Sequence, residues 1–228
     1  MNTFILLSAG IGERMRKSTP KQFLMLGGKP IILHSLEKVD QIDEISEVII
    51  VCQKEYIKII ENLIVNRSLK DKYICVEGGD TRQQSVFNGL NKANNDSVII
   101  HEAVRPFVSV KDYRRIIENK NENVIYGKNI NYTVLKGTKI VTDILERDLL
   151  INVQLPQKFN KDKLLLAHKK AKEEGKTFTE DASLLFFYEK EIISVMEGNE
   201  YNIKITTPLD IIIGEIIYKE YILNRSDL

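Results

Sequence analysis

The loop after the apolar run Thr3–Leu7 carries residues that could bind phosphate. Gly10 and Gly12 lie in this loop, and glycines let backbone N–H groups approach an anion without an intervening Cβ. Arg14 and Lys21 add two cations nearby. The spacing is not a P-loop, because GxxxxGK(S/T) is absent, and it is not a Rossmann fingerprint, because Met15 stands where the third glycine should be. Phosphate binding and an ordinary β-to-α turn with solvated charges are both compatible with this pattern.

A second segment of this kind follows the predicted strand Tyr73–Val76. It contains Gly78, Gly79, Asp80 and Ser85. Polar side chains at the carboxyl end of a strand suit contacts to a base or ribose in the crevice of an open α/β sheet. The alternative is that Asp80 only caps the next helix and Ser85 lies on its surface.

Two further charged positions could hold anions. Glu102 and Arg105 share one loop after His101, and together they could bind a metal-bound phosphate and a second anion, or simply pair on the surface. We expect His101 to pack or bond the loop and not to ligate a metal. Lys204 lies in the apolar segment 202–206, where burying it unpaired is costly. It therefore lies either in a site or on an edge strand facing solvent.

Short apolar runs alternate with helix-period segments, which predicts βαβ units and a mostly parallel sheet flanked by helices. The predicted strands are Thr3–Leu7, Glu47–Cys52, Tyr73–Val76, Ser97–His101, Asn123–Tyr126 and Ile192–Met196. The predicted helices are Pro30–Val39, Glu55–Val65, Thr81–Lys92, Val110–Lys120, Lys161–Glu174 and Thr179–Tyr188.

A last helix is predicted from its start signals. Thr207 suits the N-cap, Pro208 the first helical position and Asp210 the third. The apolar spacing after it predicts a buried stripe, formed by Leu209, Ile212, Ile213 and Ile216.

The segment Ile130–Ile144 differs from the rest of the chain. Its β-branched residues surround Lys136-Gly137, a hairpin turn signal. We expect residues 1–228 to form one domain, with residues 130–153 inserted as a β-arm that extends from the sheet. The arm is too apolar to stand free in water, which favours a homodimer formed through it.

Composition bounds the class of protein. Of 228 residues, 43% are hydrophobic and 29% charged, and the net charge is +1; this is typical of a folded domain and excludes one that holds nucleic acid by bulk charge. Cys52 and Cys75 form no CxxC motif and the three histidines are scattered, so no disulfide framework or zinc site is expected. No membrane span or signal peptide is expected either. We predict a cytoplasmic protein without nucleic-acid or membrane partners.

The motifs occur in an order that resembles one family. They are Ser8-Ala-Gly-x-Gly-x-Arg-Met, Pro20-Lys-Gln-Phe, Gly78-Gly-x-x-Arg-x-x-Ser-Val, His101-Glu-Ala-Val-Arg-Pro, Glu146-Arg-Asp, Gln154-Leu-Pro-Gln, Thr179-Glu-Asp-Ala-Ser and Asn202-Ile-Lys-Ile-Thr-x-Pro. Together they resemble the 2-C-methyl-D-erythritol 4-phosphate cytidylyltransferases of isoprenoid synthesis. Ribitol-5-phosphate cytidylyltransferase, of wall and capsule synthesis, is a close relative of that family.

The resemblance implies a Rossmann-like domain that dimerises through its β-arm, and it implies site residues. Arg14 and Lys21 match the transition-state stabilisers, and Arg147 and Lys204 match the pair that positions the acceptor phosphate. Acceptor-pocket residues, some supplied across the dimer, are Arg105, Thr133 and Thr179. Nucleotide-binding positions are Ser8, Ala9, Gly10, Gly12, Gly79, Asp80 and Ser85.

The implied reaction is the transfer of CMP from CTP to a sugar-alcohol phosphate, with release of pyrophosphate. The acceptor phosphate is already a dianion near pH 7, so cations and Mg²⁺ or another divalent ion are needed, and a general base is not. Glu102 stands where the family usually has Asp, and it is the expected protein ligand of the metal.

Other departures from the family pattern, such as Tyr132 and Leu155, leave the acceptor open. The first choice is 2-C-methyl-D-erythritol 4-phosphate, and the alternative is ribitol 5-phosphate or another polyol phosphate. A nucleotide-binding partner protein with weakened activity is a third, different class.

Overall fold

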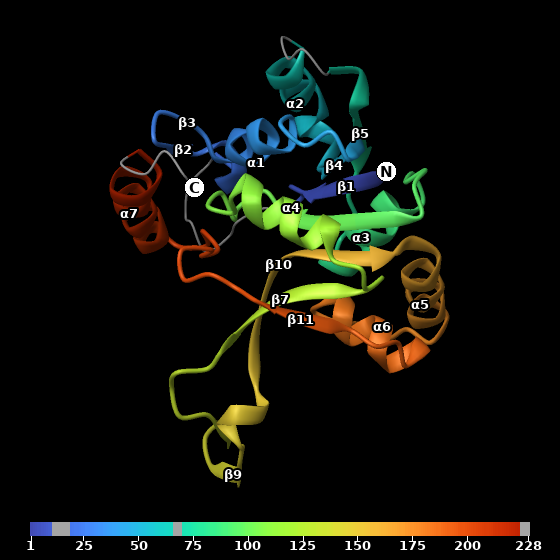
Figure 1. Ribbon diagram of the computed structural model, residues 1–228, viewed down its shortest axis with the longest axis vertical. Coiled ribbons are helices and arrows are strands. Elements are labelled where there is room, and N and C mark those ends of the chain that lie inside the picture. The colour runs from blue at the N-terminus through green and yellow to red at the C-terminus, as the bar shows by residue number, and fades with distance from the viewer. Residues whose placement is uncertain (11–18, 66–69, 224–228) are drawn as a thin grey trace.

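A seven-stranded sheet forms the centre of the described part of the chain, residues 1–10, 19–65 and 70–223 of the computed structural model. Its strand order is β11-β7-β10-β6-β1-β4-β5, and only β10 runs antiparallel to its neighbours (Figure 1). The mostly parallel α/β sheet predicted from the sequence is confirmed. The strands are β1 (Asn2–Leu7), β4 (Ile45–Cys52), β5 (Tyr73–Glu77), β6 (Ser97–Glu102), β7 (Val124–Asn129), β10 (Ile151–Asn160) and β11 (Ser194–Glu197).

Helices cover both faces of this sheet, because the central strands are apolar on both sides. In β1, Phe4 and Leu6 point into one core, while Ile5 and Leu7 point into the other. The first core is closed by α1 (Ile31–Val39), α2 (Ile57–Ile64) and α4 (Val110–Glu118), and the second by α3 (Arg82–Leu90), α5 (Lys161–Glu173) and α6 (Asp181–Glu189).

The predicted elements lie close to the observed ones, but three strands were missed. The short hairpin β2 (Met25–Leu26) and β3 (Lys29–Pro30) precedes α1. Strand β10 carries no clear strand signal because Pro156 interrupts it, and its pairing with β7 shifts register between Gln154 and Gln157.

Helix α7 (Pro208–Ile217) begins as predicted, with Thr207 and Asp210 forming a capping box. Its predicted buried stripe is wrong, since the side chains in question are 40–61% exposed; they are Leu209, Ile212, Ile213 and Ile216. The helix is apolar nearly all round and packs instead through Gly214 and Ile217. A Cβ at Gly214 would lie 3.2 Å from Leu26, so the missing side chain lets the core approach this face.

The segment between β7 and β10 leaves the sheet and protrudes (Figure 1). There β8 (Leu135–Gly137) pairs with β9 (Val141–Ile144) as a separate antiparallel sheet. The turn lies at residues 138–140, not at Lys136-Gly137 as predicted, because both of those residues pair within β8. Residues 151–153 of the expected arm belong to β10 and pair with β7.

The segment 202–206 is not a strand, although its alternation predicts one. It runs alongside the end of β6, where the N–H of Ile205 donates to the carbonyl of Val104 at 2.9 Å. Within the described residues, every helix is too short or too polar to cross a membrane.

Candidate active site

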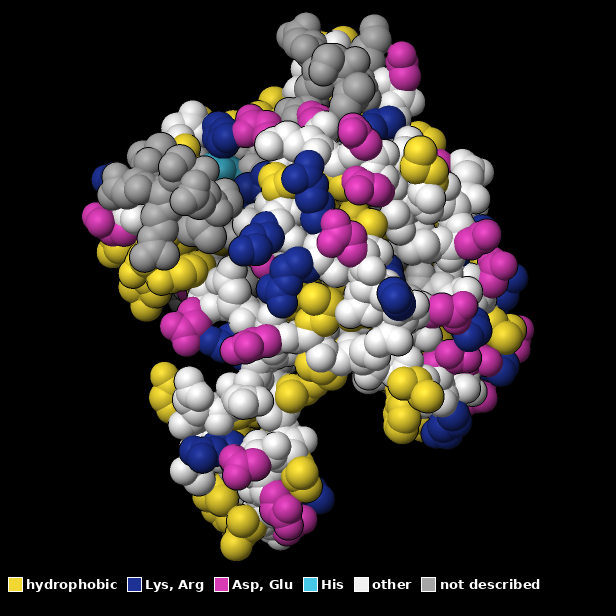
Figure 2. All heavy atoms as spheres, viewed as in Figure 1, with side chains coloured by type: hydrophobic (Ala, Val, Ile, Leu, Met, Phe, Trp, Pro, Cys, Tyr) yellow, Lys and Arg dark blue, Asp and Glu magenta, His cyan; other side chains and the backbone are white. Residues whose placement is uncertain are grey.

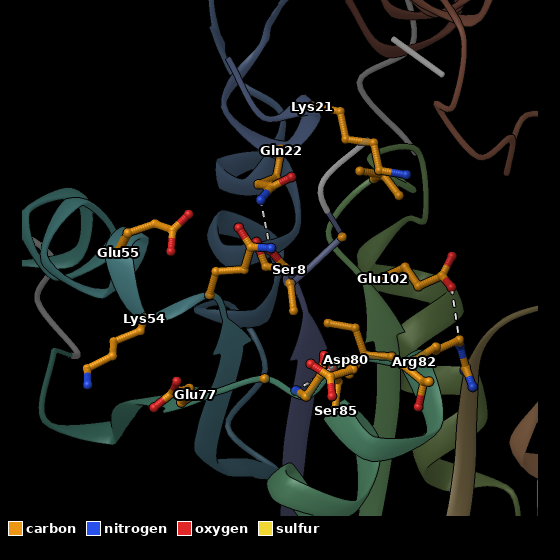
Figure 3. Close-up of a pocket in the computed structure, with 18 of the residues that line it drawn as sticks. Ser8, Lys21, Gln22, Lys54, Glu55, Glu77, Asp80, Arg82, Ser85 and Glu102 are labelled. Atoms are coloured by element: carbon orange, nitrogen blue, oxygen red, sulfur yellow. Dashed lines mark hydrogen bonds and ion pairs between the residues drawn. The ribbon is translucent and has the colours of Figure 1, made fainter. Parts of the chain in front are cut away.

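A cavity of about 520 Å³ lies at the carboxyl ends of β1, β4, β5 and β6. Parallel strands bring these ends to one edge of the sheet, so loops that are distant in sequence meet there. Predicted site residues from the loops after β1, β5 and β6 and from the segment 202–206 line this cavity, and Figure 3 shows several of their side chains around it. They are Ser8, Ala9, Gly10, Lys21, Gly79, Asp80, Ser85, Glu102 and Lys204.

Two hydrogen bonds hold the backbone of Ser8, at the start of the first loop. The N–H of Ser8 donates to the carbonyl of Val51 at 2.7 Å, and Gln22 Nε2 donates to the carbonyl of Ser8 at 2.8 Å. The Oγ atom of Ser8 is buried and has no hydrogen-bond partner among the described residues. Such a group is costly to bury alone, which favours a ligand that bonds to it. The predicted residues Gly12 and Arg14 lie outside the described residues.

The structure contradicts the alternative interpretation of the second loop, in which Asp80 caps the helix and Ser85 lies on its surface. The N-cap of α3 is Thr81, whose hydroxyl accepts from Gln84 N–H at 3.1 Å, so Asp80 is not the cap. Ser85 is buried and accepts from the N–H of Gly79 at 3.1 Å. It is therefore a loop-fixing residue and not a helix-surface serine.

Close packing explains why the loop begins with a glycine, Gly78. A Cβ at Gly78 would lie 2.6 Å from the Cβ of Ala9 in the first loop. A side chain would separate the two loops that line the cavity, so glycine lets them touch.

Glu102 lies at the centre of a cluster of cations. Its carboxylate is 2.9 Å from Lys204 Nζ, 3.4 Å from Arg82 Nε and 3.5 Å from Arg105 Nε. Burial by itself would raise the pKa of Glu102, but Lys204 and Arg82 outweigh it and lower the pKa to about 2. The pair of Glu102 and Arg105 exists, but its side chains are only 9% and 13% exposed, so the interpretation of a solvated surface pair is wrong.

The neighbouring His101 is a packing residue, as the sequence predicts. Its ring is fully buried between Phe4 and Tyr113, and Nε2 lies 3.0 Å from the carbonyl oxygen of Arg105. Burial lowers its pKa to about 3, so the ring is neutral and supports the loop that carries Arg105.

A second cavity, of about 650 Å³, lies at the root of the arm. Arg105 and Lys204 line it together with residues 128–132 and 151–154. Since Lys204 lines both cavities, it is the point at which two ligands could meet.

Three predicted acceptor residues lie outside both cavities. Thr133 and Thr179 are exposed, and Arg147 lies in the arm, paired with Asp148 at 3.6 Å. Sequence reasoning also missed Arg82, which lines the first cavity, and Asp181, which is ion-paired to it at 2.7 Å. Both lie inside motifs that the resemblance uses, so a signal for them was present.

Comparison with known proteins agrees with this geometry. The family model for 2-C-methyl-D-erythritol 4-phosphate cytidylyltransferase matches residues 3–220. The enzyme of that name from Clostridium botulinum (strain Okra) is 37% identical, over 96% of this chain and 98% of the relative. The chloroplastic enzyme of rice (Oryza sativa subsp. japonica) is 35% identical, over 95% of this chain and 74% of the relative.

Solved structures give the same result. The 4-diphosphocytidyl-2C-methyl-D-erythritol synthase of Anaerococcus prevotii has a TM-score of 0.85 at 29% identity, covering 96% of each chain. The 2-C-methyl-D-erythritol 4-phosphate cytidylyltransferase of Francisella tularensis has a TM-score of 0.76 at 29% identity, covering 95% of this chain and 99% of the other. These matches span nearly the whole chain, and this protein therefore belongs to the 2-C-methyl-D-erythritol 4-phosphate cytidylyltransferase family.

Proposed function

We propose that this protein transfers CMP from CTP to 2-C-methyl-D-erythritol 4-phosphate in isoprenoid precursor synthesis and releases pyrophosphate. The family match over residues 3–220 supports this, and it does not favour the ribitol alternative. The observation that carries the proposal is one shared residue. Lys204 lines both the nucleotide cavity and the cavity at the arm root, so the two phosphates can meet there.

In this proposal the protein gathers two polyanions and stabilises the charge that develops between them. An oxygen of the acceptor phosphate attacks the α-phosphorus of CTP, and the bond to pyrophosphate breaks. Lys21, whose side chain lies along Gly10, and Arg14 are the proposed stabilisers of the five-coordinate phosphorus. Lys204 and Arg105 hold the acceptor phosphate. Positioned cations of this kind supply most of the catalysis in phosphoryl transfer.

The base and ribose of CTP are assigned to the two loops that meet at Gly78. The hydroxyl of Ser8 and the carboxylate of Asp80 both lie at this cavity, and they are suited to polar groups of a nucleoside. Cytosine can be selected over uracil by backbone carbonyls that accept from its exocyclic amine.

A divalent cation enters this proposal with the triphosphate, as the Mg²⁺ complex of CTP. The sequence predicts Glu102 as its protein ligand, but the residues do not fit a protein-held metal. Both carboxylate oxygens of Glu102 already contact Lys204 at 2.9 Å. In the described residues no three His, Cys, Asp or Glu side chains are grouped to hold an ion. We therefore treat Mg²⁺ as part of the substrate, because Mg²⁺ is commonly held by phosphates and water.

We also propose a homodimer formed through the arm. Apolar side chains of the arm are 49–83% exposed, namely Tyr132, Leu135, Ile140, Val141 and Ile144. Figure 2 shows hydrophobic side chains on the surface of the protruding arm. A second copy would cover them. It would also bring Thr133 and Arg147 from one protomer toward the cavity at the arm root of its partner, which suits their proposed roles. The cytoplasmic location stays a prediction.

A pyrophosphate-release assay tests the proposed reaction. We expect release with CTP and 2-C-methyl-D-erythritol 4-phosphate, and much less with ribitol 5-phosphate or with UTP or ATP as donor. A higher kcat/KM with ribitol 5-phosphate would reassign the acceptor. No release with any polyol phosphate would favour the nucleotide-binding partner protein instead.

A further inference from the structure

Asp181 lies outside both cavities but is joined to the nucleotide cavity through one arginine. It is the first residue of α6, and only 1% of its surface is exposed. Its Oδ2 atom lies 2.7 Å from Arg82 Nη2, and its Oδ1 atom lies 3.3 Å from Nε2 of the buried His168 on α5. Neither Asp181 nor His168 lines a described cavity, whereas Arg82 lines the nucleotide cavity.

Arg82 bridges two carboxylates. Its Nε atom lies 3.4 Å from Glu102 Oε1 (Figure 3), while Nη2 contacts Asp181. A guanidinium is planar, with donors in a fixed fork, so holding one end also sets the direction of the other. Asp181 therefore determines from which side Arg82 meets Glu102.

The charge of Asp181 is maintained in spite of its burial. Burial would raise the pKa of Asp181, but Arg82 outweighs this and lowers the pKa to about 2. A buried carboxylate is costly unless it is paired, and a neutral residue of similar shape could pack against α5 at lower cost. A buried, charged Asp181 is expected where its charge is needed to hold Arg82 in position.

The contacts continue from Arg82 into the site. Charges alternate along Asp181, Arg82, Glu102 and Lys204, with Lys204 Nζ 2.9 Å from both oxygens of Glu102. Arg105 contacts Glu102 from another side at 3.5 Å. If Arg82 lost its anchor, Glu102 would be drawn toward the remaining cations, and Lys204 would lose its fixed place between the two cavities.

We infer that Asp181 is a positioning residue for the transfer reaction: through Arg82 it orients Glu102, and Glu102 fixes the ammonium group of Lys204. This inference rests on the proposed role of Lys204 in holding the acceptor phosphate. It assigns a function to the motif Thr179-Glu-Asp-Ala-Ser through its buried aspartate, since Thr179 itself is exposed.

The test is steady-state kinetics of Asp181→Asn, which keeps the shape and removes the charge. We expect kcat/KM for 2-C-methyl-D-erythritol 4-phosphate to fall roughly tenfold or more, because small displacements of positioned groups have effects of this size. The KM for CTP is expected to change less than threefold. Asp181→Glu keeps the charge and should recover part of the loss.

A matched control separates positioning from general destabilisation. Glu47 is another buried carboxylate, bonded to Thr3 Oγ1 at 2.6 Å and to the N–H of Asn94 at 3.0 Å. It lines neither cavity. Glu47→Gln should lower the melting temperature while leaving kcat/KM for the acceptor near wild type.

A double-mutant cycle tests whether Asp181 acts on kcat/KM through Arg82, which a purely structural role of Asp181 would not require. If Asp181 acts through Arg82, then Asp181→Asn should have almost no further effect on kcat/KM in an Arg82→Gln background. Independent effects would instead multiply. Should Asp181→Asn fail to fold, Arg82→Lys takes its place, since a single ammonium cannot bridge both carboxylates, and the same loss toward the acceptor is expected.

Three results would overturn the inference while wild type remains active: unchanged acceptor kinetics in a folded Asp181→Asn, multiplicative effects in the cycle, or unchanged acceptor kinetics in Arg82→Lys. Failure of the proposed function is distinguishable, because wild type itself would then release no pyrophosphate with this acceptor. In that case the same variants are measured with whichever polyol phosphate the wild-type protein accepts as substrate.

Discussion

The Nζ atom of Lys204 lies 2.9 Å from each carboxylate oxygen of Glu102, although 102 positions separate the two residues. This contact ties the segment before α7 to the end of β6. It supports the proposed role of Glu102 in holding cations, because a carboxylate surrounded by cations is better suited to that role than to binding a metal.

Replacing Glu102 by Gln tests this role. We expect kcat/KM for the acceptor phosphate to fall about tenfold or more, since Lys204 loses its partner and a displaced positioning group has effects of this size. The Mg²⁺ concentration that gives half-maximal rate should stay near wild type. Glu102→Asp keeps the charge and should be tolerated better. A large rise in the Mg²⁺ requirement of Glu102→Gln would restore Glu102 as a metal ligand.

Lys21→Ala should lower kcat far more than it raises the KM for CTP, by roughly 100-fold. The reason is that Lys21 is proposed to contact charge that grows in the transition state, as an oxyanion-hole donor does. Arg14→Ala is expected to act in the same direction. Steady-state kinetics with varied CTP measure both parameters. An unchanged kcat with a higher KM would instead make these residues binders of ground-state CTP.

Gly78→Ala should raise the KM for CTP. The new Cβ would lie 2.6 Å from the Cβ of Ala9 and would force apart the two loops of the nucleotide cavity. Gly89→Ala is the control. Gly89 lies on α3 and does not line the cavity, and its new Cβ would meet Ile5 Cγ2 of β1 at 2.8 Å. This substitution should lower the melting temperature but leave the KM for CTP unchanged. An equal KM in wild type and Gly78→Ala would contradict the assignment of this loop to the nucleotide.

Ile140→Asp should convert the proposed dimer to a monomer, since Ile140 is an exposed apolar side chain of the arm and a charge there opposes burial. Light scattering at micromolar concentration gives the mass. Ile192→Asp is the matched control: Ile192 is 86% exposed but lies outside the arm, so its variant should stay dimeric. A monomeric mass for the wild-type protein would contradict the dimer proposal.

Two buried histidines predict how stability depends on pH. Burial lowers the pKa of His101 to about 3 and that of His34 to about 4, from an ordinary value of 6.5. Between pH 6.5 and 4 the unfolded chain therefore binds more protons than the native one. The free energy of unfolding should fall as pH decreases through this window, by up to about 1.4 kcal/mol per pH unit for each histidine.

Urea unfolding at pH 7, 6 and 5 measures this dependence. His34→Gln is the informative variant, because Gln can still donate to the carbonyl of Leu26, which lies 2.9 Å from His34 Nε2, but does not titrate. Its stability should vary less steeply with pH than that of wild type. Identical slopes would mean that His34 does not contribute.

The sequence alone was enough to predict the class of fold and the reaction family. Apolar runs such as Glu47–Cys52 and the capping signals Thr207 and Asp210 are local, and local preferences act through neighbouring residues along the chain. They placed most strands and helices within a few residues. Strand β10 was not predicted, because Pro156 lacks the N–H that a strand donates to its neighbour. The segment becomes a strand through its pairing with β6 and β7.

The tertiary structure decided which side chains face each other. Sequence spacing could not show that Glu102 contacts Lys204 and Arg82. It also could not show that Asp181 is buried and paired with Arg82. These contacts join segments about 20 to 100 positions apart, whereas periodicity relates only residues close along the chain. Sequence spacing also could not show which side of an almost entirely apolar helix is buried. That side of α7 is determined by residues distant in sequence that pack against Gly214, namely Leu26, Phe107 and Ile205. Periodicity identifies an apolar face, and the packing of the whole chain determines whether that face is covered.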